Sequence, residues 1–144
     1  MHQKMLEFLQ REHLLTLSVC DVQGVYSASC FYCFFKEGYT LVCKSQESSR
    51  HIQLARKNPF VGVNIAHHTK KIQEISGMQI KALLRHAKEQ ETGCYHAKYP
   101  FARLGGGEVY ALEILWAKYT DNSLLIPKKL EYRREICYTS PKKE

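Results

Sequence analysis

Three apolar runs joined by very short connections constrain the fold of this chain most strongly. The runs are Leu14–Cys20, Val25–Phe35 and Tyr39–Lys44, and they are rich in the β-branched and aromatic residues that favour strands. The links between them, Asp21–Gly24 and Lys36–Gly38, carry turn residues and are too short for a crossover to a parallel strand. We therefore expect an antiparallel meander.

Later segments continue the strand pattern. Strands are predicted over Phe60–Ala66, Ile72–Leu84 and Glu108–Tyr119. Gly77 interrupts the second of these, which indicates a bulge or a close approach of two backbones. The segment from Leu124 to Glu144 is predicted to form a short strand followed by a basic tail.

Helices are predicted between these strands, over Met1–Arg11, Ser49–Lys57 and Arg85–Lys98. The second is expected to end at Asn58–Pro59, because proline disfavours helix in the residue before it. Together the elements predict a mainly β (α+β) fold. It would be a closed or nearly closed six-stranded antiparallel β-barrel with helices over its openings. No repeat or linker divides the chain, so residues 1–144 are expected to form one domain, with the tail from about residue 124 least defined.

Composition supports a folded protein that lies outside the membrane. Hydrophobic residues make up 44% of the chain and charged residues 24%. No apolar run approaches the ~20 residues needed to cross a bilayer. The first helix is amphipathic and lacks the apolar centre of a signal peptide, so a cytoplasmic location is expected.

The net charge of +7 favours an anionic partner. Lysine and arginine are dispersed along the chain, however, with dense clusters only at Lys70–Lys71, Lys128–Arg134 and Lys142–Lys143. No recognition helix, RNA-binding aromatic signature or zinc finger is present. The charge therefore permits nucleic-acid binding without indicating it.

Cysteine and histidine spacing does not predict a metal site. The six cysteines are expected to be reduced thiols in a chain without a signal sequence. Cys30 and Cys33 are three residues apart in a strand, so their sulfurs should point to opposite faces, and no second pair completes a zinc site. His67 and His68 are interpreted as surface turn residues for the same reason.

The segment Lys44–His51 is the best candidate for a ligand site. It follows a strand and opens a helix, where free backbone N–H groups and the helix dipole favour a phosphate. Ser45, Ser49 and Arg50 add hydrogen-bond donors. The local sequence leaves a second interpretation open, in which a serine is an ordinary N-cap and Arg50 and His51 are merely solvated.

The order of several segments resembles a known family. They are Leu14–Gly24, Tyr26–Ser29, Ser45–His51 with Asn58–Pro59, Ile75–Ile80, Tyr95–Phe101, and Val109–Asn122 with Trp116. In this order and spacing the chain resembles the FMN-binding split-barrel superfamily typified by pyridoxamine 5'-phosphate oxidase, in particular a small bacterial branch of it. The resemblance runs from about Leu14 to Asn122.

The resemblance implies a six-stranded split barrel that forms a homodimer with FMN in grooves between the subunits. Lys44, Ser45, Ser49, Arg50 and His51 would hold the phosphate. The ring would lie against Ser29, Cys30 and Phe31, with Gln79 as a polar contact and Trp116 as a wall from either subunit. The function implied is an FMN-dependent oxidoreductase that transfers hydride between the flavin and a small or nicotinamide substrate.

Departures from the family pattern limit which functional expectations the resemblance supports. His51 stands where a second firm cation is usual, so Arg50 is the main fixed charge. The substrate-binding Arg-x-His signature is missing from Leu124–Glu144, so the resemblance does not extend to pyridoxamine phosphate oxidation. Relatives on this fold bind FMN, the deazaflavin F420 or haem, which leaves a non-catalytic flavin or haem carrier as an alternative. A basic nucleic-acid-binding module is the weaker alternative.

Overall fold

The computed structural model describes residues 1–123 and 128–135 of the chain. The described residues contain the strands β1 (Leu14–Asp21), β2 (Gly24–Phe35), β3 (Thr40–Ser45), β4 (Phe60–Ala66), β5 (Ser76–His86), β6 (Glu108–Asp121) and β7 (Lys128–Arg133). The helices are α1 (Gln3–Arg11), α2 (Arg50–Lys57) and α3 (Glu89–Lys98). Short 3-10 turns are η1 (Lys36–Gly38), η2 (Ile72–Glu74) and η3 (Pro100–Leu104).

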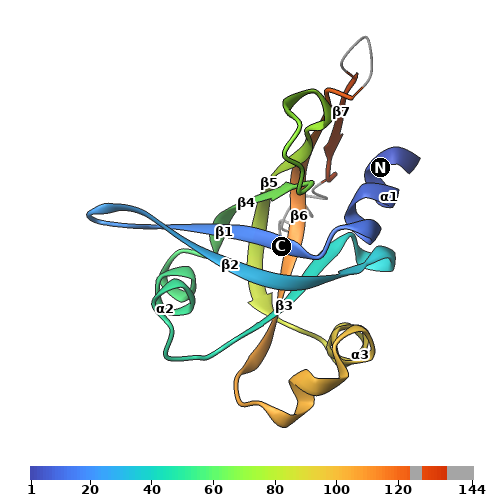
Figure 1. Ribbon diagram of the computed structural model, residues 1–144. Coiled ribbons are helices and arrows are strands. Elements are labelled where there is room, and N and C mark those ends of the chain that lie inside the picture. Colours follow the sequence, from blue (N-terminus) through green and yellow to red (C-terminus); the bar gives the residue numbers. More distant parts are fainter. Residues whose placement is uncertain (124–127, 136–144) are drawn as a thin grey trace, which may run out of the picture.

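The first six strands close into an antiparallel barrel (Figure 1). Their order is β3-β2-β1-β4-β5-β6, and the pairing of β3 with β6 joins the two ends. The hairpin pairings β1–β2 and β2–β3 are those that the short connections require. β7 pairs with the remaining part of β6, outside the barrel. The predicted six-stranded antiparallel barrel is therefore confirmed, with one additional strand.

Alternation along the strands fills the barrel with apolar side chains. Leu15, Leu17 and Val19 of β1 point inward and are almost fully buried. The same buried cluster includes the apolar faces of α1 and α2, which lie at well-separated places on the barrel (Figure 1). α3 differs, because it packs on the outer side of β2 and β3 in a second, smaller cluster around Val42 and Tyr95.

Two predicted boundaries are wrong at β5. The strand begins at Ser76 instead of residue 72, since the residues before it form η2. It also continues through Arg85 and His86, which were expected in the helix. These residues stay in the sheet because they pair with β6, and α3 begins at Glu89, where the Glu91 carboxylate accepts the Lys88 backbone N–H at 2.8 Å.

Gly77 marks a close backbone approach, one of the two outcomes expected for it. A Cβ placed there would lie 3.2 Å from the carbonyl oxygen of Ile65 on β4. The register irregularity of this strand falls elsewhere, between Lys81 and Ala82.

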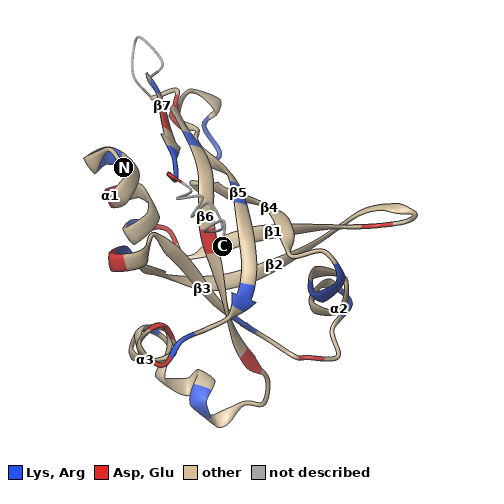
Figure 2. Ribbon diagram, turned by 180° about the vertical axis from the view of Figure 1, so that it is seen from behind, with Lys and Arg blue, Asp and Glu red and all other residues tan. Residues whose placement is uncertain are grey.

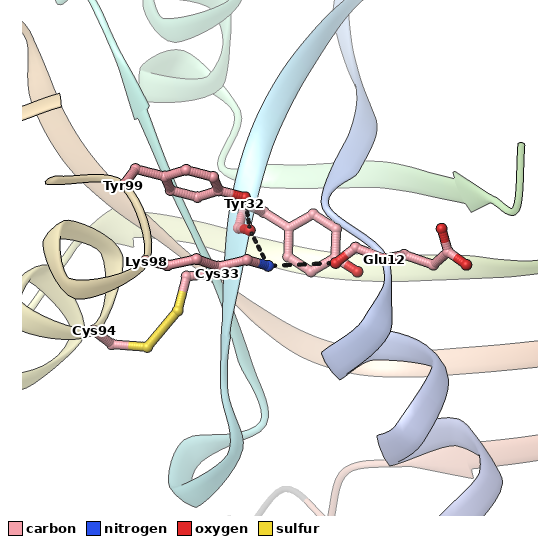
Figure 3. Close-up of a disulfide and its surroundings, with 6 residues drawn as sticks. All are labelled: Glu12, Tyr32, Cys33, Cys94, Lys98 and Tyr99. Atoms are coloured by element: carbon pink, nitrogen blue, oxygen red, sulfur yellow. Dashed lines mark hydrogen bonds between the residues drawn. A yellow bond between two sulfur atoms is a disulfide. The ribbon is translucent and has the colours of Figure 1, made fainter. Parts of the chain in front are cut away.

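The expectation of reduced cysteines is wrong for Cys33 and Cys94, which form a disulfide between β2 and α3 (Figure 3). The two residues are 61 positions apart, and the packing of α3 outside the barrel brings them together. The expected divergence of Cys30 and Cys33 is confirmed, because Cys30 belongs to the barrel core and Cys33 to the outer cluster. Cys137 and the predicted basic tail lie outside the described residues.

Among the described helices, none is long and apolar enough to cross a membrane.

Candidate functional site

The predicted phosphate turn connects β3 to the start of α2. Ser49 holds the N-cap position, but its hydroxyl donates to the Gln46 carbonyl and does not cap the helix. Among residues 1–123 and 128–135, no acceptor bonds the backbone N–H groups of Arg50, His51 and Ile52. Unpaired N–H groups at the positive end of a helix are suited to bind an anion.

Ser45 and His51 are joined directly across this turn. The Ser45 hydroxyl lies 2.9 Å from Nε2 of His51. Burial lowers the pKa of His51, so its imidazole is largely neutral at neutral pH. The Cys30 thiol lies 4.0 Å from the same hydroxyl, and a hydrogen bond with Cys43 lowers the pKa of Cys30 to about 7 against the opposing effect of burial. The Ser45–His51 pair is thus polar and largely uncharged.

Arg50 supplies the accessible positive charge at the start of α2. Its side chain is 56% exposed, and its one described ion pair joins Nη2 to the Asp21 carboxylate at 3.2 Å. Exposed pairs of this kind are worth less than about 1 kcal/mol, so the guanidinium can turn to another anion at small cost. The structure therefore leaves Arg50 available for a phosphate.

Lys44 points away from the turn. Adjacent residues of a strand face opposite sides, and the Lys44 ammonium donates to the backbone carbonyls of Ala102 and Gly105 instead. It fixes the segment after α3 to β3. The sequence groups Lys44 with Ser45 and His51, but in the structure its side chain lies away from them.

The predicted ring wall on β2 divides between two faces. Ser29 and Phe31 are exposed on the outer face, whereas the side chain of Cys30 is buried inside the barrel. Phe31 is 54% exposed, lies parallel to the His13 ring at 5.9 Å and meets the edge of Tyr99. Only the backbone of Cys30 is placed to line the same surface.

Gln79 lies on this outer face at a distance from β2. The strand registers align one row of residues across four neighbouring strands: Ser29, Thr16, Asn64 and Gln79. Three strand spacings amount to ~14 Å, which places Gln79 well away from Ser29. Gln79 is exposed, as a ligand contact would require.

Trp116 lies one strand further, on β6. Its indole N–H donates to Glu131 of β7, and the Lys81 ammonium lies 5.6 Å from its ring centre. Neither contact involves α2. The described contacts of Trp116 therefore do not connect it to Arg50.

Sequence reasoning missed one pair of functional groups. Nδ1 of His67 lies 2.9 Å from the carboxylate of Glu12, and both residues line a cavity of about 560 Å³ with His13 and His68. His67 remains exposed, as expected for a turn residue, but it is not simply solvated. A separation of 55 residues leaves no sequence signal for this pairing.

Within the described part of the chain, basic residues are not confined to one element. Figure 2 shows lysine and arginine on several elements, interspersed with aspartate and glutamate. This agrees with the dispersed charge of the sequence.

Comparison with known sequences identifies the family. No protein-family model matches the chain. A UPF0306 protein of Campylobacter jejuni is 38% identical over 136 residues, which cover 94% of this chain and 100% of that protein. A UPF0306 protein of Yersinia pseudotuberculosis is 30% identical over 131 residues, covering 88% of this chain and 89% of the relative. The chain belongs to the UPF0306 family.

Comparison with solved structures confirms the fold. A haem-binding protein of Mycobacterium smegmatis superposes with a TM-score of 0.70 at 9% identity, over 86% of this chain and 56% of that chain. An FAD-binding protein of Mesorhizobium loti superposes with a TM-score of 0.66 at 12% identity, over 79% of this chain and 87% of that chain. A proposed pyridoxamine 5'-phosphate oxidase of Listeria innocua superposes with a TM-score of 0.63 at 16% identity, over 81% of this chain and 94% of that chain. The chain thus has the split-barrel fold of pyridoxamine 5'-phosphate oxidase-like proteins.

Proposed function

We propose that this protein binds FMN and acts as an FMN-dependent oxidoreductase. The observation that carries the proposal is the start of α2, where unpaired backbone N–H groups lie beside the exposed guanidinium of Arg50. The FAD-binding neighbour on this fold adds support for a flavin, and FMN ends in a phosphate that such a site would hold.

The residues present fit the parts of FMN. Arg50 and the N–H groups of α2 would hold the phosphate, and the Ser45 and Ser49 hydroxyls would add hydrogen bonds. His51 would contribute mainly as a neutral hydrogen-bonding group because burial lowers its pKa. Phe31 offers an exposed aromatic surface for the flat ring. When bound, FMN supplies the hydride chemistry, and the protein orients it and its substrate.

The strand spacing between the predicted ring wall on β2 and the strands β5 and β6 favours a homodimer. Gln79 and Trp116 lie on β5 and β6, across the outer face from the predicted ring wall on β2. Two copies packed through this face would let these residues reach the cofactor held by the other copy. Size-exclusion chromatography with light scattering tests this part of the proposal, and a monomer that binds FMN would exclude it.

The absorption spectrum of the purified protein is the first test. We expect flavin bands near those of free FMN, and a loss of about 10- to 100-fold in FMN affinity in Arg50→Ala, as expected for a charge-assisted phosphate contact. Lys57→Ala is the matched control, because it removes one charge from the other end of α2. A Soret band would instead indicate a haem protein. A colourless protein without FMN affinity that binds oligonucleotides in a salt-dependent way would overturn the proposal.

A second experiment separates an enzyme from a carrier. Anaerobic mixing of the FMN-loaded protein with NADH or NADPH should bleach the flavin bands faster than the same mixture bleaches free FMN. Bound flavin that neither nicotinamide nor small reduced substrates can bleach would favour a carrier function.

A further inference from the structure

The cavity that His67 lines combines apolar walls with polar groups. It lies between β1, β4 and the segment leading to β5, with a volume of about 560 Å³. Leu14, Ala66 and Ile75 provide apolar surface, and Thr16 and Asn64 provide hydrogen-bonding groups. A second hollow of about 270 Å³ shares Asn64, Ala66 and Ile75 and extends toward Gln79. The outer face is thus hollowed for a small ligand with both apolar and polar parts.

Glu12 fixes the protonation of His67. Glu12 is 8% exposed, and its carboxylate lies 2.9 Å from Nδ1 of His67 and accepts from Nε of Arg11 at 3.1 Å. An ionised carboxylate only accepts hydrogen bonds, so Nδ1 must carry the proton. The lone pair of the neutral imidazole is then on Nε2. Side chains held in this way are typical of proton acceptors in catalytic sites.

The cavity lies next to the predicted ring wall. Leu14 and Thr16 line it from β1, and they pair in register with Phe31 and Ser29 of β2. His13, another lining residue, lies parallel to the Phe31 ring. A ligand in the cavity would therefore be one strand away from a flavin on β2.

We propose that this cavity binds an alcohol or amine substrate and that His67 accepts its proton through Nε2. This inference rests on the proposed function, because the bound flavin would accept the hydride from the same substrate carbon. The substrate O–H or N–H bond breaks, the proton forms an N–H bond on His67, and the alcohol or amine becomes a carbonyl or imine. Nδ1 keeps its proton in the hydrogen bond to Glu12, and the Glu12 carboxylate stabilises the resulting imidazolium.

Histidine NMR tests which ring nitrogen of His67 carries the proton, and it needs no cofactor. Long-range ¹H–¹⁵N spectra of the apo protein should show neutral His67 protonated on Nδ1. Glu12→Gln should shift that tautomer toward Nε2–H, the form that predominates in free histidine, while circular dichroism confirms that the variant remains folded. His67 protonated on Nε2 in the unaltered protein would overturn the proposal.

Ligand binding tests the cavity. Benzyl alcohol and benzylamine should shift the His67 ring signals saturably, and toluene, which has no proton donor, should shift them at least tenfold less. His67→Gln should weaken both ligands, whereas His86→Gln, a control at an exposed histidine outside the cavity lining, should change affinity less than threefold. Equal shifts with toluene, or equal effects of the two variants, would exclude the role of His67.

FMN affinity separates this inference from the proposed function. His67→Gln should leave FMN affinity within threefold, because His67 makes no described contact with the α2 turn. If FMN fails to bind while the alcohol still reports on His67, the proposed function fails and the cavity assignment stands. If FMN binds and the alcohol does not, the inference alone is wrong.

Discussion

The attachment of α3 and the start of α2 use polar residues in opposite ways. At α3, Arg85 bonds Glu91 at 2.8 and 3.0 Å and Glu113 at 2.7 Å. Lys98 and Tyr99 donate to the Tyr32 carbonyl, next to a disulfide (Figure 3). At α2, Arg50 makes one exposed ion pair and the first N–H groups have no described acceptor.

This difference indicates which polar groups are free for a ligand. Arg85 is paired with Glu91 and Glu113, and Lys98 donates to backbone carbonyls, so these groups hold the helix on the barrel. At the start of α2, the Arg50 guanidinium and the first backbone N–H groups can still form hydrogen bonds. They are not needed to hold the helix, because burial of Ile52 and Ala55 already packs it on the barrel. We therefore expect the first region to be structural, and the proposed ligand site lies at the second.

Removal of the Cys33–Cys94 disulfide should have the largest effect on stability. Closing a loop between residues 61 positions apart restricts the unfolded chain, so the loss should be about 4 kcal/mol. Urea unfolding of the double variant Cys33→Ser, Cys94→Ser, and of the unaltered protein with and without a phosphine reductant, measures it. Cys20→Ser, at an exposed free cysteine, is the control. A loss below 1 kcal/mol would contradict a structural role for the bridge.

Arg85→Ala should destabilise the protein by about 2–4 kcal/mol, because it leaves the buried carboxylate of Glu91 unpaired. Chemical unfolding measures the change. Arg50→Ala removes the exposed pair with Asp21 at the start of α2 and should cost less than about 1 kcal/mol. Equal losses in the free energy of unfolding for the two substitutions would contradict the distinction between the two regions.

His51 should produce a smaller, pH-dependent effect. Burial lowers its pKa, so the folded state favours the neutral imidazole, and this contribution is complete above the unfolded pKa of about 6.5. Stability should fall as the pH drops from about 6.5 toward the lower folded pKa. Urea midpoints at pH 7.5, 6.5 and 5.5 should show a shallower decline in His51→Gln. Part of the decline should remain, because burial also lowers the pKa of His96. An unchanged slope would show that His51 is not the titrating group.

Much of the fold was predictable because it depends on local alternation and short turns. The strands around Leu17 and the hairpin at Gly24 follow directly from such patterns. Arg85 was misplaced because a residue at a strand end has no local signal for its sheet partner. The start of α2 was also predictable, since Ser45 and Arg50 are close in sequence.

The rest of the site depends on contacts between distant segments. The side chain of Lys44 was assigned to the turn, but strand alternation sends it to the carbonyls of Ala102 and Gly105. The Glu12–His67 pair and the disulfide join segments 55 and 61 residues apart. No pattern in a single sequence reports such contacts, and only the packing of the barrel reveals them.

Comparison of FMN with riboflavin tests the central claim most directly, because the two ligands differ only in the phosphate. In the unaltered protein FMN should bind at least about tenfold more tightly than riboflavin, as expected for one or more charge-assisted phosphate contacts. Arg50→Ala should remove most of that difference, with little change in riboflavin affinity, whereas Lys57→Ala should preserve it. Equal affinity for the two flavins, or an equal loss of both in Arg50→Ala, would contradict a phosphate site at the start of α2.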